Sequence, residues 1–83
     1  MRVNVYIRLK GGVLDPEGET IKNSLQGLHF SEVQSVRAGK VFQLELSEED
    51  PARARQRTEE MCRQLLANPV IEDYQIEIME PPS

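Results

Sequence analysis

Hydrophobic and polar positions alternate along residues 2–10, which is the period-two pattern of a β-strand with one buried face. The residues of this predicted buried face are Val3, Val5, Ile7 and Leu9. A second alternating segment lies near the other end of the chain, and its apolar positions are Val70, Tyr74, Ile76 and Ile78. The pattern therefore predicts one strand near each end of the chain.

Two segments have helical periodicity instead. Ile21, Leu25 and Leu28 recur at helical spacing and predict a short amphipathic helix over about 16–28. A longer helix is predicted over about 51–67, with an inner stripe of Ala54, Thr58, Met61, Cys62 and Leu65.

Both predicted helices have recognisable ends. Each follows an Asp-Pro pair, Asp15-Pro16 or Asp50-Pro51, in which the aspartate caps the first turn and the proline leaves no N–H unpaired. We expect His29 just past the first helix, where the backbone often turns left-handed. Asn68-Pro69 is expected to end the second helix, because proline cannot continue it.

Residues 32–38 and 41–46 predict two middle strands, joined by a tight turn at Ala38-Gly39-Lys40. The first of these strands is irregular, because Val33 and Val36 fall on opposite faces unless a bulge intervenes. The predicted order is β-α-β-β-α-β. We therefore expect a two-layer α+β fold, ferredoxin-like or a variant, with a four-stranded sheet and two helices on one face.

The other face of this predicted sheet is left open. In a ferredoxin-like arrangement the first and last strands are neighbours, so their basic and acidic side chains pair across the open face. Tyr6, Ile71 and Met79 interrupt this polar surface with apolar area. The mixture favours contact with another copy or another subunit, while a solvated sheet is the alternative.

Length and charge restrict the possible partners. The 83 residues fit one domain, 1–83, and residues 79–83 are expected to form a loose C-terminal tail. With 10 Lys plus Arg against 14 Asp plus Glu, the net charge of −4 argues against nucleic acid or membrane as a partner. The N-terminus does not resemble a signal peptide and no apolar run reaches the ~20 residues of a membrane span, so we expect a cytoplasmic protein.

The sequence predicts no catalytic residues and no metal site. His29 and Cys62 are the only histidine and cysteine, and nothing in their spacing predicts a nucleophile–base pair. A helix-terminating histidine and a buried, unreactive cysteine are the simpler interpretations. The arginines of the second helix resemble an RNA-reading surface, but Glu49 precedes Arg53 by one helical turn, which favours a solvated face with ion pairs.

Three loop segments are more specific than these single residues. They span residues 12–18, with Asp15, Pro16 and Gly18, residues 36–40, and residues 66–74. In this order and spacing they resemble the PurS family, the small subunit of phosphoribosylformylglycinamidine synthase, and the resemblance runs from about Val3 to Glu77. One departure is His29, where the family usually has glycine.

The resemblance implies a non-catalytic assembly subunit of a ligase complex in de novo purine biosynthesis. Such a subunit bridges a PurQ glutaminase and a PurL synthetase and aids ammonia transfer between them. The complex converts formylglycinamide ribonucleotide to its amidine, using ATP and glutamine. The resemblance implies no cofactor in this chain, with ATP and magnesium in the synthetase, and a homodimer or a dimer of dimers.

The same segments supply the candidate contact residues. Arg37, Gly39 and Lys40 are expected to present one partner surface, and Asn68, Pro69 and Glu72 to shape another. Asp15, Pro16 and Gly18 are expected to be a structural motif. An ACT-like regulatory domain that binds a small molecule is the alternative, because it shares the β-α-β-β-α-β order.

Overall fold

The computed structural model describes residues 1–79. The strands are β1 (Arg2–Leu9), β2 (Gly39–Glu45) and β3 (Glu72–Met79). The helices are α1 (Pro16–Gly27) and α2 (Pro51–Met61), and α2 continues into a π-helical turn, η1 (Cys62–Leu66). The loose tail expected at 79–83 lies outside the described residues, except for Met79, which ends β3.

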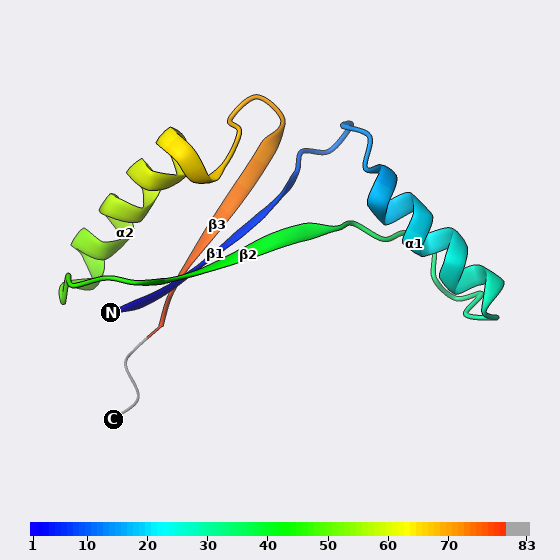
Figure 1. Ribbon diagram of the computed structural model, residues 1–83, viewed down its shortest axis with the longest axis horizontal. Helices are drawn as coiled ribbons and strands as arrows, with labels where there is room; N and C mark the ends of the chain where they lie inside the picture. The colour runs from blue at the N-terminus through cyan, green and yellow to red at the C-terminus, as the bar shows by residue number, and fades with distance from the viewer. Residues whose placement is uncertain (80–83) are drawn as a thin grey trace.

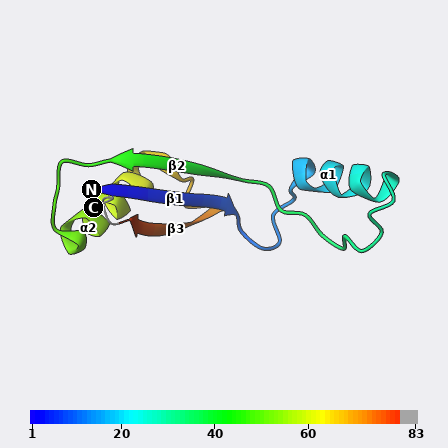
Figure 2. The same ribbon diagram turned by 90° about the horizontal axis from the view of Figure 1, so that it is seen from below.

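The three strands form one antiparallel sheet in the order β2-β1-β3. Val5 of β1 lies opposite Phe42 on one side and Ile76 on the other, so the first and last strands are neighbours as predicted. Figure 2 shows the sheet from its open face, with α2 behind it.

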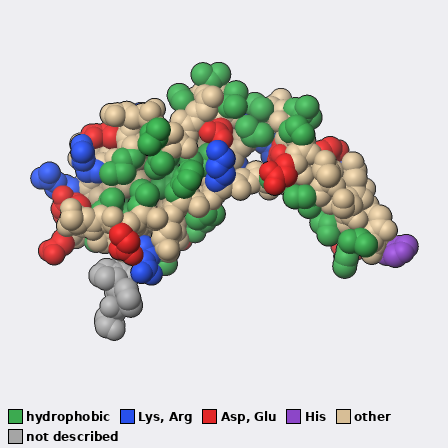
Figure 3. All heavy atoms as spheres, viewed as in Figure 1, with side chains coloured by type: hydrophobic (Ala, Val, Ile, Leu, Met, Phe, Trp, Pro, Cys, Tyr) green, Lys and Arg blue, Asp and Glu red, His purple; other side chains and the backbone are tan. Residues whose placement is uncertain are grey.

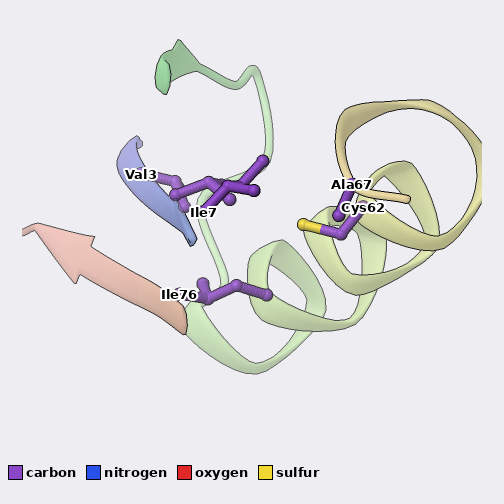
Figure 4. Packing of buried hydrophobic residues seen from close by; sticks show 6 residues of the cluster. Val3, Ile7, Cys62, Ala67 and Ile76 are labelled. Atoms are coloured by element: carbon purple, nitrogen blue, oxygen red, sulfur yellow. The ribbon is translucent and has the colours of Figure 1, made fainter. Parts of the chain in front are cut away.

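The core lies between the sheet and α2 with its π-helical turn. Val3, Val5 and Ile7 of the central strand are almost completely buried, as is Cys62. In Figure 4 the Cys62 side chain points from the helix toward the strands, where Val3, Ile7 and Ile76 lie. The predicted role of Cys62 as an apolar core residue is confirmed.

The π-helical turn changes which leucine faces the core. The backbone N–H of Ala67 donates to the carbonyl of Cys62 at 3.0 Å, a bond that spans five residues instead of four. This extra residue places Leu66 against the core and leaves Leu65 83% exposed. The prediction of Leu65 on the inner stripe is therefore wrong, because it assumed an uninterrupted α-helical period.

The predicted four-stranded sheet is also wrong for the described residues, which contain three strands. Residues 32–38 form no strand, and no tight turn joins them to β2. Gly39 and Lys40 are instead the first residues of β2, and Gly39 does not have a positive φ. The opposed faces of Val33 and Val36 were the sequence signal that this segment is not a regular strand of the same sheet.

The placement of α1 is the largest departure from the predicted fold. Together with its flanking loops, α1 extends beyond the end of the sheet and does not lie beside α2 (Figures 1 and 2). Its residues Ile21 and Leu28 are 39% and 65% exposed, although the helical pattern predicts them buried. We call residues 10–38, which contain α1, the arm.

The end of α1 agrees with prediction. His29 has a φ of 75°, the left-handed conformation expected just past the helix. The N–H of Phe30 donates to the carbonyl of Leu25 at 3.0 Å, and that of His29 donates to Gln26 at 3.1 Å. This pair of bonds closes the helix in the manner of a Schellman motif.

Candidate functional site

A single carboxylate joins the two ends of the arm. Asp15 Oδ1 accepts a hydrogen bond from the N–H of Gly18 at 2.9 Å, and Oδ2 accepts one from the N–H of Ala38 at 2.8 Å. The first bond caps α1 as predicted, with Pro16 in the first turn of the helix. The second bond was not foreseen, because Asp15 and Ala38 are far apart in the sequence. Both bonds favour the ionised form and hold the pKa of Asp15 below its ordinary value.

Gly18 permits the chain to return close to α1. A Cβ atom at this position would collide with the backbone carbonyl oxygen of Val36 and would crowd the carboxylate of Asp15. Glycine is therefore required here by a close approach of backbone, although φ is not positive.

Arg37 fastens the returning segment to the end of β1. Its Nη2 atom donates to the carbonyl of Leu9 at 2.7 Å and to the carbonyl of Lys10 at 3.1 Å. We call the contacts of Asp15, Gly18 and Arg37 the junction. The junction fixes the arm to the sheet through hydrogen bonds, with little apolar packing.

The loop that follows η1 is organised around Asn68 and Glu72. The N–H of Asn68 donates to Glu72 Oε1 at 2.7 Å, and the N–H of Glu72 donates to the carbonyl of Asn68 at 2.8 Å. Asn68 Oδ1 also accepts from the N–H of Val70 at 3.0 Å. The side chains of Asn68 and Glu72 thus maintain the turn, and Pro69 lies within it.

The structure brings Lys40 together with this second loop. Lys40 Nζ lies 4.0 Å from Glu72 Oε2, and the Lys40 side chain is exposed while that of Glu72 is largely covered. Residues that the sequence placed in two separate contact groups therefore meet at one end of the sheet. Arg37 takes no part in this ion pair, because its guanidinium donates to the backbone carbonyls of Leu9 and Lys10 at the end of β1.

A hollow of about 660 Å³ lies at this same end of the molecule. Of the predicted contact residues, Arg37, Gly39 and Lys40 line the hollow, whereas Asn68, Pro69 and Glu72 do not. The other lining residues are Tyr6, Ile7, Arg8, Ala38, Val41, Asp73, Tyr74 and Gln75. Arg8 and Asp73 lie opposite each other in the β1–β3 register, so charges of both signs face this hollow.

The remainder of the open face is a network of polar pairs. Tyr6 Oη donates to Glu77 Oε1 at 2.9 Å, and Asn4 Nδ2 donates to the same oxygen at 3.2 Å. Arg2 Nε lies 2.9 Å from Glu45 Oε1 across the β1–β2 ladder. The predicted pairing of basic with acidic side chains between the first and last strands is wrong for the described residues. Asn4 and Tyr6 bind Glu77 of β3 as neutral donors, and Arg2 pairs with Glu45 of β2 instead.

The two residues with the most reactive side chains are far apart. His29 lies at the outer end of the arm (Figure 3), and Cys62 is fully buried beneath the sheet. Burial raises the pKa of the Cys62 thiol, which keeps it protonated and unreactive at neutral pH. The open face around the hollow, by contrast, offers charges, hydrogen-bond donors and apolar side chains to a partner surface.

Two further properties of residues 1–79 concern metal ligands and membrane spans. Within this range, no three or more His, Cys, Asp and Glu side chains are grouped in a way that could hold a metal ion. The helices in the same range include none whose length and apolar character would suit a membrane span.

Comparison with protein families gives a match along almost the whole chain. The family model of PurS, described as phosphoribosylformylglycinamidine (FGAM) synthase, matches residues 2–80. The PurS subunit of phosphoribosylformylglycinamidine synthase from Methanocaldococcus jannaschii is 43% identical over 77 residues, covering 93% of each chain. The corresponding Bacillus subtilis subunit is 43% identical over 79 residues, covering 95% of this chain and 93% of the relative.

Solved structures agree with the sequence match. The crystal structure of Methanocaldococcus jannaschii PurS superposes with a TM-score of 0.89 at 42% identity and covers 98% of each chain. A chain in the structure of PurLQS from Thermotoga maritima superposes with a TM-score of 0.84 at 32% identity, covering 92% of this chain and 93% of that one. The similarity therefore includes the path of the arm as well as the sheet.

Proposed function

The chain belongs to the PurS family, and on that premise we propose that it is the assembly subunit of a phosphoribosylformylglycinamidine synthase complex. The complex is a glutamine-dependent ligase of de novo purine biosynthesis. In this proposal the chain bridges a PurL-type synthetase and a PurQ-type glutaminase and aids the passage of ammonia between them. The single observation that carries the proposal is the near-complete match to a chain in the structure of PurLQS.

The arrangement of side chains supports a role without chemistry in this subunit. Cys62 is enclosed in the core, and His29 lies on the arm far from it. From the family resemblance we assign ATP and magnesium to the synthetase and expect no cofactor to be held by this chain. The proposal treats residues 1–83 as one domain that works in the cytoplasm with the other two subunits, and as a homodimer or a dimer of dimers.

We assign one partner surface to the rim of the hollow, where Lys40 is exposed next to Glu72. Replacing Lys40 with glutamine should weaken retention of the other two subunits several-fold in a pull-down. The chain should stay folded, since an exposed ion pair contributes only about 0–1 kcal/mol. Arg37 is a poorer choice for this test, because its replacement also releases the ends of the arm.

Arg53→Gln is the matched control for this experiment. Arg53 forms a comparable exposed ion pair with Glu48, at 3.3 Å, but lies at the start of α2. Retention that is unchanged by Lys40→Gln, or reduced equally by Arg53→Gln, would remove the assignment of Lys40 to a partner surface.

The hollow also favours a second candidate function, an ACT-like domain that binds a small molecule. Its volume of about 660 Å³ is within the range of small-molecule sites, and it combines aromatic with charged side chains. A thermal-shift screen with amino acids and nucleotides tests this alternative. A saturable rise in melting temperature with one ligand, in the absence of other subunits, would favour it over assembly alone.

A further inference from the structure

The hollow at the end of the sheet carries more positive than negative charge, unlike the chain as a whole. Three cations, Arg8, Arg37 and Lys40, line it together with a single carboxylate, Asp73. The whole chain has a net charge of −4, so its overall field repels a long polyanion. The hollow is therefore a local site for a small anion on an acidic molecule.

The guanidinium of Arg8 has no partner within residues 1–79. Asp73 lies opposite Arg8 in the β1–β3 register, but the two side chains form no ion pair. On the β2 side Arg8 lies opposite Gly39, which has no side chain, so the space beside the guanidinium is open. Arg2 at the other end of β1 differs, because its Nε atom lies 2.9 Å from Glu45 Oε1. Arg8 is therefore available to a ligand, and a guanidinium is well suited to bind a phosphate through two parallel hydrogen bonds.

Arg37 and Lys40 add positive charge to the same hollow in different ways. The bonds from Arg37 Nη2 to the carbonyls of Leu9 and Lys10 hold the guanidinium in place without neutralising its charge. Lys40 is partly balanced by Glu72, 4.0 Å away, which does not line the hollow. Arg37 is thus a positioned cation, and an anion that binds it does not have to order the side chain first.

The part of the hollow next to this cationic end is apolar. Tyr6 and Val41 lie opposite each other in the β1–β2 register and are 39% and 59% exposed. Tyr6 Oη donates to Glu77 Oε1 at 2.9 Å, which fixes the orientation of the ring. The hollow therefore presents an apolar surface with a fixed aromatic ring beside a group of cations, and such a surface suits a ring that carries an anionic group.

We infer that the hollow binds a small phosphate monoester that carries a ring, of the size of a nucleoside monophosphate. The phosphate lies against Arg8 and Arg37, and the ring packs on Tyr6 and Val41. The excess of cations over carboxylates favours such an anion over a zwitterionic amino acid, which requires charges of both signs in equal number. This site rests on the small-molecule candidate above, for which it names the class of ligand, and it is independent of the assembly role.

Titration calorimetry of the isolated full chain with AMP and IMP tests the class of ligand. Saturable binding of at least one of the two is expected. Inorganic phosphate and adenosine should each bind about tenfold more weakly or less than AMP does, since each makes only one of the two sets of contacts. Absence of saturation by both nucleotides up to about 5 mM, or equally strong binding of inorganic phosphate or adenosine, would overturn the proposal.

Three variants place the phosphate within the hollow. Arg8→Gln should weaken nucleotide binding about tenfold, because a charged hydrogen-bond donor is lost. Arg2→Gln is the matched control on the same strand and face, and it should leave the affinity unchanged. Asp73→Asn should tighten binding, because it removes a carboxylate that repels the phosphate. Urea unfolding checks that each variant is folded. Equal losses for Arg8→Gln and Arg2→Gln, or weaker binding by Asp73→Asn, would contradict the assignment.

Two further measurements keep this site separate from the functions proposed above. Amino acids are titrated into the same protein, and binding of an amino acid without binding of any phosphate ester would overturn the inference while preserving the small-molecule candidate. Retention of the synthetase and glutaminase by the unmodified chain is measured without added ligand. Loss of the assembly role is therefore detected independently of nucleotide binding.

Discussion

At the scale of single residues, the junction depends on a few short contacts with little apolar packing behind them. Asp15 receives two backbone N–H groups, and Gly18 allows the carbonyl of Val36 to approach. The sequence predicted the cap of α1, because an aspartate before a proline is a strong local signal. It could not predict the bond from Ala38, which depends on the path of the whole arm.

Replacing Gly18 with alanine tests the close approach. The new methyl group would collide with the Val36 carbonyl, so unfolding free energy should fall by about 1–3 kcal/mol, as for an overpacked site. Gly27→Ala is the matched control, since a Cβ there meets no atom within 4 Å and alanine is the better helix former by about 0.5–1 kcal/mol. Urea unfolding measures both, and a Gly18→Ala protein as stable as the control would contradict the account.

The two hydrogen bonds to Asp15 also predict a pH dependence. Because they lower the pKa of the folded carboxylate, their contribution is complete above the unfolded value of about 3.9. It is lost as the pH falls from there through the lower folded pKa. The stability difference between the unmodified chain and Asp15→Asn should therefore be constant near neutral pH and shrink below about pH 4. Urea unfolding of both proteins from pH 7 to pH 3 checks this, and a difference that does not change would exclude the mechanism.

At the scale of elements, periodicity predicted α1, α2 and three strands to within a few residues. It failed where a helix changes its period and where a segment leaves the sheet. The π-helical turn moved the buried position from Leu65 to Leu66, and a uniform helical period cannot reveal such a turn. Residues 32–38 have strand-like composition, but Val33 and Val36 fall on opposite faces, and the junction holds the segment in line with β2 instead of beside it.

The two leucines of the π-helical turn provide a test of this register. Leu66→Ala should lower the free energy of unfolding by about 2 kcal/mol, because it removes side-chain volume packed against the core. Leu65→Ala should change it by no more than about 0.5 kcal/mol, since that side chain is 83% exposed. Chemical denaturation of the pair measures both values. Equal losses, or a larger loss at Leu65, would mean that α2 continues without a π-helical turn.

At the scale of the whole molecule, the chain is flat and elongated, with principal extents of 47 × 34 × 13 Å. An 83-residue chain with a third of its length in a projecting arm buries only a small core. Chains with so little buried surface are commonly stabilised by association with other chains. The candidate contact residues were found by resemblance to a family, because charges such as Lys40 and Glu72 have no signature in periodicity. Only the structure shows that Lys40 and Glu72 lie close together at one end of the sheet.

In the proposed function this subunit joins two enzymes and performs no reaction itself. The most direct test is reconstitution of glutamine-dependent amidation of formylglycinamide ribonucleotide from a PurL-type synthetase and a PurQ-type glutaminase, with and without this chain. We predict that glutamine-dependent turnover requires the chain, while ammonia-dependent turnover by the synthetase does not. Equal glutamine-dependent rates in its absence, or turnover by this chain alone, would contradict the account.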